Sequence, residues 1–205
     1  MATRKITKKI DGRNVNAYCE EAFSLQAKSI LELVSDTQKS KNVLLEGYKL
    51  QIGWSMYIMA IIDGELALIV PDYMKNPFED TVSDISLALW VCSRQIALLK
   101  QTNLEGEYVT FKDTMIILKE ALETDDLFFL RQEARGDGDS GWYLGALGDK
   151  KEGRPASDYI SVRTYQLLTI RPELLKLLFL PTGCMAIIKE GEITEIVDAG
   201  DNRVL

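Results

Sequence analysis

Histidine is absent from all 205 residues of this chain. Its absence excludes the Ser-His-Asp and Cys-His catalytic arrangements, which need an imidazole as general base. The three cysteines, Cys19, Cys92 and Cys184, lie far apart and form no Cys-x-x-Cys pair, so the sequence indicates no zinc site and no disulfide framework. We expect three reduced thiols, each used as a small buried apolar residue in a cytoplasmic protein.

Long apolar runs are also absent. The longest apolar stretches, Met56–Ile62 and Leu66–Val70, are far shorter than the roughly 18 residues that a membrane-spanning helix needs. The basic start, with Arg4, Lys5 and two further lysines, is not followed by the apolar region of a secretory signal. The sequence therefore predicts a cytoplasmic protein with no membrane partner.

Basic residues are in the minority, with 24 Lys and Arg against 31 Asp and Glu and a formal net charge of −7. The imbalance lies in residues 51–205, where 15 basic residues face 25 acidic ones. Nucleic acid is not expected as a partner of this part, because affinity for nucleic acid depends on neutralising phosphates. A basic partner is electrostatically favoured, although the same acidity is also typical of an ordinary soluble surface.

Alternating apolar residues and short apolar runs beside turn signals predict strands at several places. Tyr48–Trp54 alternates with the period of a half-buried strand, and Met56–Ile62 and Glu65–Val70 flank Asp63-Gly64, a dipeptide suited to a type I′ turn. Further strands are expected at Leu127–Arg131, Trp142–Leu144 and Tyr159–Val162, and a closing hairpin at Cys184–Ile188 and Ile193–Val197. Apolar stripes with helical spacing predict helices at Val15–Ser35, Thr81–Lys100, Asp113–Glu123 and Pro172–Phe179.

These elements predict an α+β fold in which antiparallel sheets carry helices on their faces. The polar residues near Thr124 suggest a division into an amino-terminal α+β region, residues 1–126, and a second α+β domain, residues 127–205. Exposed strand edges leave a homodimer possible without indicating one.

A glycine-rich acidic turn, Gly136–Gly145, is the most distinctive segment. It includes Gly-Asp-Ser-Gly, the letters of a serine-protease nucleophile segment, but the chain has no histidine to act with the serine. A calcium loop beginning at Asp137 fails on spacing, because Trp142 stands where glycine is needed and Gly148 where glutamate is needed. A weak calcium or magnesium contact at Asp137 and Asp139 stays open, and no phosphate-binding or dinucleotide-binding motif is present.

Two roles remain for this turn. In the structural role, Asp139 and Ser140 cap the turn and Trp142 enters the core. In the recognition role, the turn and its surroundings contact a partner, and the candidate residues are Asp137, Asp139, Ser140, Trp142 and Asp149. A weaker alternative is acid–base catalysis by two carboxylates from the set Glu133, Asp137, Asp139 and Asp149.

Four segments carry a family resemblance: Asp139–Gly145, Tyr165–Leu168, Arg171–Leu175 and Leu180–Gly183. They resemble the thirty-third numbered immunity-protein family of bacterial polymorphic-toxin systems, over about Phe128–Val197. The upstream segments, Gly53-Trp54, Pro71–Tyr73 and Asn76–Glu79, are similar to the amino-terminal region often attached to that domain. The resemblance implies an α+β fold and a role in neutralising a toxin by binding it, and it brings no catalytic residues.

The leading hypothesis is a non-enzymatic cytoplasmic immunity protein whose acidic surface binds a basic protein toxin. The first alternative is a housekeeping interaction or scaffold protein, and the weaker one is a carboxylate-dependent enzyme. No cofactor, metal, nucleic-acid or membrane partner is expected.

Overall fold

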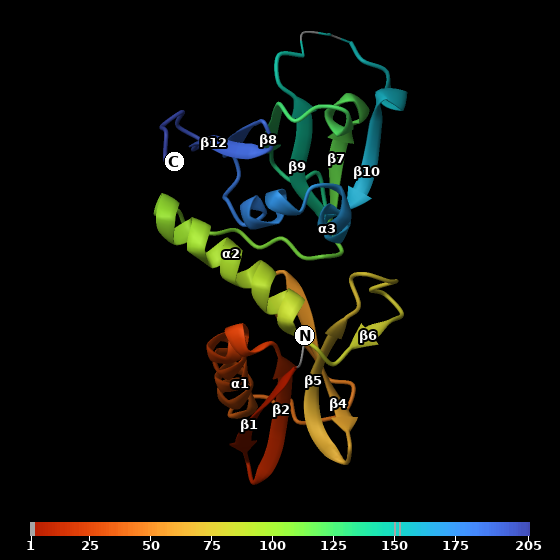
Figure 1. Cartoon of the computed structure of the whole chain (residues 1–205), viewed down its shortest axis with the longest axis vertical. Helices are drawn as coiled ribbons and strands as arrows, with labels where there is room; N and C mark the ends of the chain where they lie inside the picture. Colours follow the sequence, from red (N-terminus) through yellow and green to blue (C-terminus); the bar gives the residue numbers. More distant parts are fainter. Residues whose placement is uncertain (1–2, 150, 152) are drawn as a thin grey trace. The chain divides into compact units, whose positions relative to one another are not determined.

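The computed structural model describes residues 3–149, 151 and 153–205. The chain divides into two compact units, Met1–Ser93 and Arg94–Leu205, and each unit contains a six-stranded sheet (Figure 1). The predicted α+β class is confirmed. The boundary expected at residues 126 and 127 falls inside the second unit, because a strand before it pairs with a strand after it. The division of the chain into two domains at this point stays a prediction.

The sheet of the first unit has the order β1-β2-β5-β4-β3, with β6 paired to β5. The pair β2 and β5 is parallel and the others are antiparallel, so the sheet is mixed where only antiparallel pairing was expected. Helix α1 packs against β1 and β2. The elements are β1 Arg4–Ile10, β2 Arg13–Cys19, η1 Glu21–Phe23, α1 Ser24–Gln38, β3 Lys49–Ile52, β4 Ser55–Ile62, β5 Glu65–Pro71 and β6 Thr81–Val82. Helix α2, Ser86–Thr102, begins in the first unit and ends in the second.

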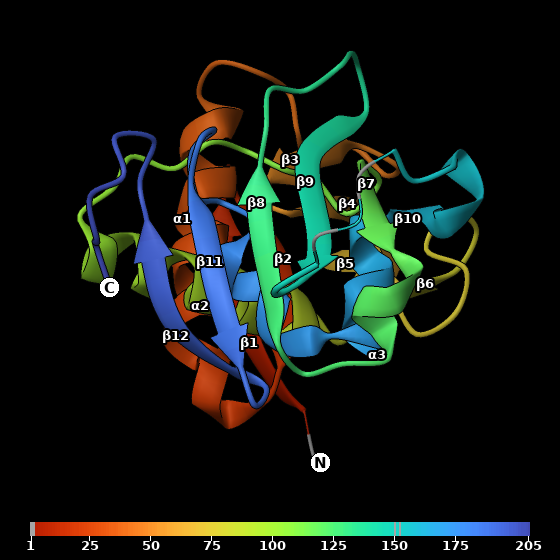
Figure 2. The ribbon, with the colours of Figure 1, turned by 90° about the horizontal axis from the view of Figure 1, so that it is seen from above.

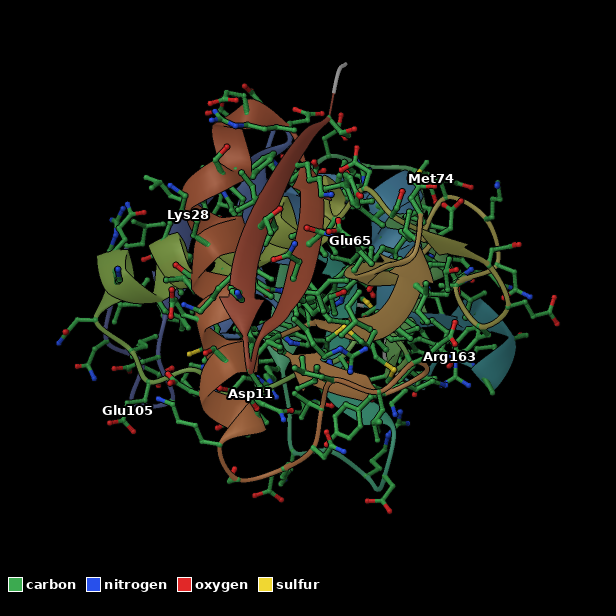
Figure 3. All side chains as sticks on the ribbon, turned by 90° about the horizontal axis from the view of Figure 1, so that it is seen from below. Asp11, Lys28, Glu65, Met74, Glu105 and Arg163 are labelled. Carbon is green, nitrogen blue, oxygen red and sulfur yellow. The ribbon has the colours of Figure 1, made fainter. Side chains whose placement is uncertain are left out.

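The predicted meander of the first unit is confirmed as β3, β4 and β5. Asp63 and Gly64 between β4 and β5 both have positive φ, 51° and 78°, as a type I′ turn requires. A second hairpin, β1 and β2, replaces the start of the helix predicted at Val15–Ser35. Its turn is Asp11-Gly12, also at positive φ, and Asp11 is labelled in Figure 3.

The helix predicted from Thr81 begins later, at Ser86. Thr81–Val82 pairs instead with β5, and the carboxylate of Asp84 accepts a hydrogen bond from the backbone N–H of Ser86 at 2.9 Å. Because Thr81 and Val82 pair with β5, the helix begins at Ser86 and not at Thr81.

A polar cluster joins three strands of the first unit. Glu65 on β5 accepts hydrogen bonds from Lys5 Nζ at 2.6 Å and from the side-chain amides of Asn14 and Asn16, each at 3.0 Å. The hydrogen bond from Lys5, followed by those from the two asparagines, lowers the pKa of Glu65 to about 2. Glu65 lies beside β1 and β2 in Figure 3, and the cluster ties the hairpin to the meander.

The sheet of the second unit has the order β10-β7-β9-β8-β11-β12, with β7 and β9 parallel (Figure 2). The closing hairpin is confirmed as β11 and β12, and the strand predicted at Leu127–Arg131 as β8. The elements are β7 Thr114–Leu118, η2 Lys119–Leu122, β8 Leu127–Arg131, β9 Asp139–Ala146, η3 Ala156–Asp158, β10 Tyr159–Arg163, η4 Thr164–Gln166, α3 Leu167–Ile170, η5 Pro172–Leu177, β11 Met185–Lys189 and β12 Glu192–Val197.

The helix predicted at Asp113–Glu123 is wrong. Thr114–Leu118 forms β7, which pairs with β9 on one side and β10 on the other, and only Lys119–Leu122 turns helically. Pairing on both sides outweighs the local helical pattern of the sequence. The helix expected from Pro172 is a 3-10 helix, η5, which ends at Leu177.

One face of the second sheet is covered by the short helices α3 and η5, which lie behind the sheet in Figure 2. Buried side chains from β7, β8 and β9 form the core with buried leucines of these helices. The indole of Trp142 stacks on Phe129 with ring centroids 4.1 Å apart, and its Nε1 donates a hydrogen bond to the carbonyl of Leu178 at 3.1 Å. In the part of the chain that the structure describes, no helix is long and apolar enough to cross a bilayer.

Candidate functional site

The outer face of the second sheet carries a row of half-buried apolar side chains. The strand register aligns Ile116 on β7 with Tyr143 on β9, Tyr143 with Leu130 on β8, and Leu130 with Met185 on β11. All four are partly exposed, while the alternate residues on the same strands are buried. This alternation gives the sheet a second apolar face, opposite the face covered by η5.

Three aromatic rings reinforce this face. The ring of Phe128 lies 5.6 Å from that of Tyr143, and Tyr143 lies 6.2 Å from Tyr159. The rings come from β8, β9 and β10, so the last contact spans β7, which lies between β9 and β10. Phe128 fits because Gly145 stands opposite it, where a β-carbon would come within 2.3 Å of the ring.

A groove of about 650 Å³ opens over this part of the sheet. Its apolar lining comes from Ile116, Tyr143 and Tyr159, and polar residues from the segment after β8 form its rim. The lining residues are Ile116, Gln132, Glu133, Arg135, Asp139, Gly141, Trp142, Tyr143, Ala156, Tyr159, Ile160 and Ser161.

The glycine-rich turn borders this groove. Arg135 Nε donates to Asp139 Oδ2 at 2.6 Å, and the backbone N–H groups of Arg135 and Gly141 donate to the same carboxylate at 3.1 Å. Burial alone would raise the pKa of Asp139, but these hydrogen bonds outweigh it and lower the pKa below its ordinary value. Asp139 therefore closes the turn and neutralises Arg135.

Gly141 shapes the start of β9. It has a φ of 74°, and a β-carbon there would lie 2.1 Å from the carbonyl oxygen of Gln132. The pairing of β7 with β9 shifts register between Thr114 and Ile116, so the strand bulges beside Gly141. Only glycine combines this φ with such a close approach of two backbones.

Ser140 and Trp142 lie in the interior, at 3% and 1% exposure. Ser140 Oγ donates to the carbonyl of Thr114 at 2.8 Å and accepts from the N–H of Trp142 at 3.3 Å, so it joins β9 to β7 across the bulge. Both residues therefore have the structural role: Ser140 caps the turn and Trp142 lies in the core. Their contribution to a partner-binding surface stays a prediction, and Trp142 is among the residues that line the groove.

Asp149 belongs to a separate ion-pair cluster around Arg154. Arg154 contacts Asp149 at 2.8 Å, Glu120 at 2.7 Å and Asp158 at 3.3 Å. The hydrogen bond from Arg154 is the main reason that the pKa of Asp149 is lowered. This cluster ties the segment before β10 to η2, and so fixes the position of Tyr159 at the groove.

Asp137 is exposed at the tip of the turn, and Glu133 is exposed at the rim of the groove. Within the described residues, neither carboxylate has an ion-pair partner. The same part of the chain contains no cluster of three or more acidic, cysteine or histidine side chains placed to hold a metal ion.

The sequence-predicted candidates are therefore only partly brought together. Asp139, Ser140 and Trp142 are neighbours on β9, Asp137 lies at the adjacent turn, and Asp149 joins the Arg154 cluster. Sequence reasoning missed the aromatic face formed by Phe128, Tyr143 and Tyr159, because ring contacts between β8, β9 and β10 depend on strand order. The available signal was the continuous apolar run Leu127–Leu130, because a strand places successive side chains on opposite faces of its sheet.

The second unit, which contains the groove, matches a known protein family. The family model described as the Imm33-like domain matches residues 94–199, which is more than half of the chain and nearly all of the second unit. The chain belongs to the Imm33-like family. The resemblance to the immunity-protein family drawn from the sequence is thereby confirmed, and the groove lies within the Imm33-like domain. No curated protein and no solved structure matches the chain.

Proposed function

We propose that this protein is a cytoplasmic immunity protein that neutralises a bacterial protein toxin by binding it directly, without catalysis. The observation that carries the proposal is the Imm33-like match over residues 94–199. An immunity protein of this kind needs a stable scaffold and an exposed contact surface, and the second unit has a sheet with one covered face and one partly exposed apolar face.

The contact surface that we propose is this outer sheet face, with the glycine-rich turn at its border. Apolar and aromatic side chains on a rigid sheet favour protein recognition, because little conformational entropy is lost when they are covered. Of the candidates from the sequence, Asp137 is exposed and available for direct contact. Asp139, Asp149, Ser140 and Trp142 are proposed to support the surface by fixing the backbone beneath it.

The expected partner carries basic residues. Residues 94–205 contain 14 Lys and Arg against 19 Asp and Glu, so the family domain is itself acidic. Opposite charges on the two proteins would accelerate association and favour the correct partner.

Co-expression with a toxin gene encoded beside the gene for this protein tests the proposal. We expect the protein to restore growth of cells that express the toxin, and to form a stoichiometric complex with the toxin on size-exclusion chromatography. A folded, well-expressed protein that neither restores growth nor forms a complex would contradict the proposal.

A further inference from the structure

We propose that the groove beside Tyr143 receives a basic side chain, arginine or lysine, from an extended apolar segment of the partner. This inference rests on the proposed function and adds to it the chemistry of the residue that the groove binds. The groove offers a negative rim, aromatic faces and an apolar floor, and each of these matches one part of such a side chain.

The negative rim is the first match. Glu133 lines the groove, is exposed, and has no ion-pair partner among the described residues. Arg135, the cation that also lines the groove, is already neutralised by Asp139 at 2.6 Å. A cation that enters the groove therefore meets an unpaired carboxylate, whereas an anion would meet Glu133 and an arginine that is already paired.

The charged groups near the groove also favour the binding of a cation. Arg154, close enough to influence the pKa of Tyr143, is surrounded by three carboxylates, those of Glu120, Asp149 and Asp158. Lys151 also pairs with Glu120, at 3.5 Å. The described groups of this cluster are therefore two cations and three carboxylates, with one net negative charge, and they do not repel a basic group. Asp137, at the tip of the adjoining turn, adds a further exposed carboxylate.

The aromatic faces are the second match. The rings of Tyr143 and Tyr159 are 6.2 Å apart and inclined at 52°. A guanidinium or ammonium group held over the face of a tyrosine is attracted by the ring electrons, and the attraction strengthens as water is excluded. Gly141 also lines the groove beside Tyr143.

The apolar floor is the third match. Ile116 lies directly opposite Tyr143 in the strand register, and both line the groove. The methylene stem of an arginine or lysine packs well on such a surface while its charged end reaches a carboxylate. The apolar neighbours of that residue would cover Leu130 and Met185, which continue the same row.

A charge reversal tests the inference in the complex with the co-expressed toxin. We expect Glu133→Lys to weaken binding by about tenfold or more, with a smaller loss at high salt, where screening reduces repulsion. Glu133→Gln should weaken binding less than Glu133→Lys. The matched control is Glu192→Lys, which places the same charge change at an exposed position on β12, the opposite edge strand of the same sheet, and should leave affinity within about twofold. Unchanged affinity of a folded Glu133→Lys variant would overturn the inference and leave the proposed function standing.

A small probe tests the groove without any toxin. Titration of the full chain with n-butylguanidinium should produce saturable NMR shifts at Glu133, Tyr143 and Tyr159, and butyrate should not. The shifts should be lost in Glu133→Lys. No saturable shift, or equal shifts from butyrate, would overturn the inference independently of whether a toxin is neutralised.

Discussion

At the scale of single residues, Trp142 shows how a distinctive side chain can serve the fold beneath the proposed contact surface. Its indole is 1% exposed and stacks on Phe129, and its Nε1 bonds to Leu178. The sequence correctly predicts that the glycine-rich turn delivers this tryptophan onto a strand. The sequence does not show on which face of the sheet the indole lies, because the bulge at Gly141 determines the faces on which the following side chains lie.

Trp142→Phe should reduce stability while leaving toxin binding intact. The substitution keeps an aromatic ring against Phe129 but removes the shorter of two side-chain hydrogen bonds to the Leu178 carbonyl, the other coming from Arg131 at 3.4 Å. The free energy of unfolding should therefore fall by about 1–2 kcal/mol. Urea unfolding measures the stability, and calorimetry of the toxin complex measures the affinity. A folded variant with unchanged stability and about tenfold weaker binding would instead place Trp142 on the contact surface.

At the scale of elements, the sequence predicts strands where an Asp-Gly turn lies between apolar strand patterns, whereas the same dipeptide at Asp11-Gly12 does not reveal a hairpin by itself. The meander follows from the alternation around Tyr48–Trp54 and from Asp63-Gly64. The hairpin of β1 and β2 is missed because β1 is rich in lysine and the apolar residues of β2 continue the helical spacing of α1. Strand β7 is missed because its apolar run also fits a helix, and only pairing with β9 and β10 makes it a strand.

The bulge of β9 should be intolerant of a side chain. In Gly141→Ala, the new β-carbon would lie 2.1 Å from the Gln132 carbonyl at a φ of 74°, so the free energy of unfolding should fall by about 3 kcal/mol or more. Gly136→Ala is the control in the same turn, because no atom lies within 4 Å of its β-carbon, and it should change stability by less than about 1 kcal/mol. Thermal unfolding of both variants gives the comparison, and equal stabilities would show that the bulge relaxes freely.

At the scale of the whole molecule, the Imm33-like match and the second compact unit begin at the same residue, Arg94. The sequence places the division later, near residue 126, because the polar residues there interrupt the apolar pattern. The pairing of β7 with β9 and β10 joins residues on both sides of that point, and such long-range pairing has no local signal. For the same reason, the sequence alone does not identify the residues that form the outer face of the sheet.

Separate unfolding of the two units can be followed with two buried thiols, Cys19 in the first unit and Cys184 in the second, each 0% exposed. Burial raises the pKa of both, that of Cys184 to about 11, so each should react with a thiol reagent only when its own unit opens. We expect Gly141→Ala to accelerate labelling of Cys184 and not of Cys19, as measured by mass spectrometry of peptides. Equal acceleration of both thiols would show that the chain unfolds as one unit.

The position of β8 has a consequence for how the protein is made. β8 lies between β9 and β11, and its Arg131 donates hydrogen bonds to the carbonyls of Leu178 and Leu180. During synthesis, β8 leaves the ribosome well before these partners, so one edge of a central strand stays unpaired until about residue 189 has emerged. Protection against a toxin would therefore begin only when the last strands join, and a chaperone that shields β8 would increase the yield of active protein.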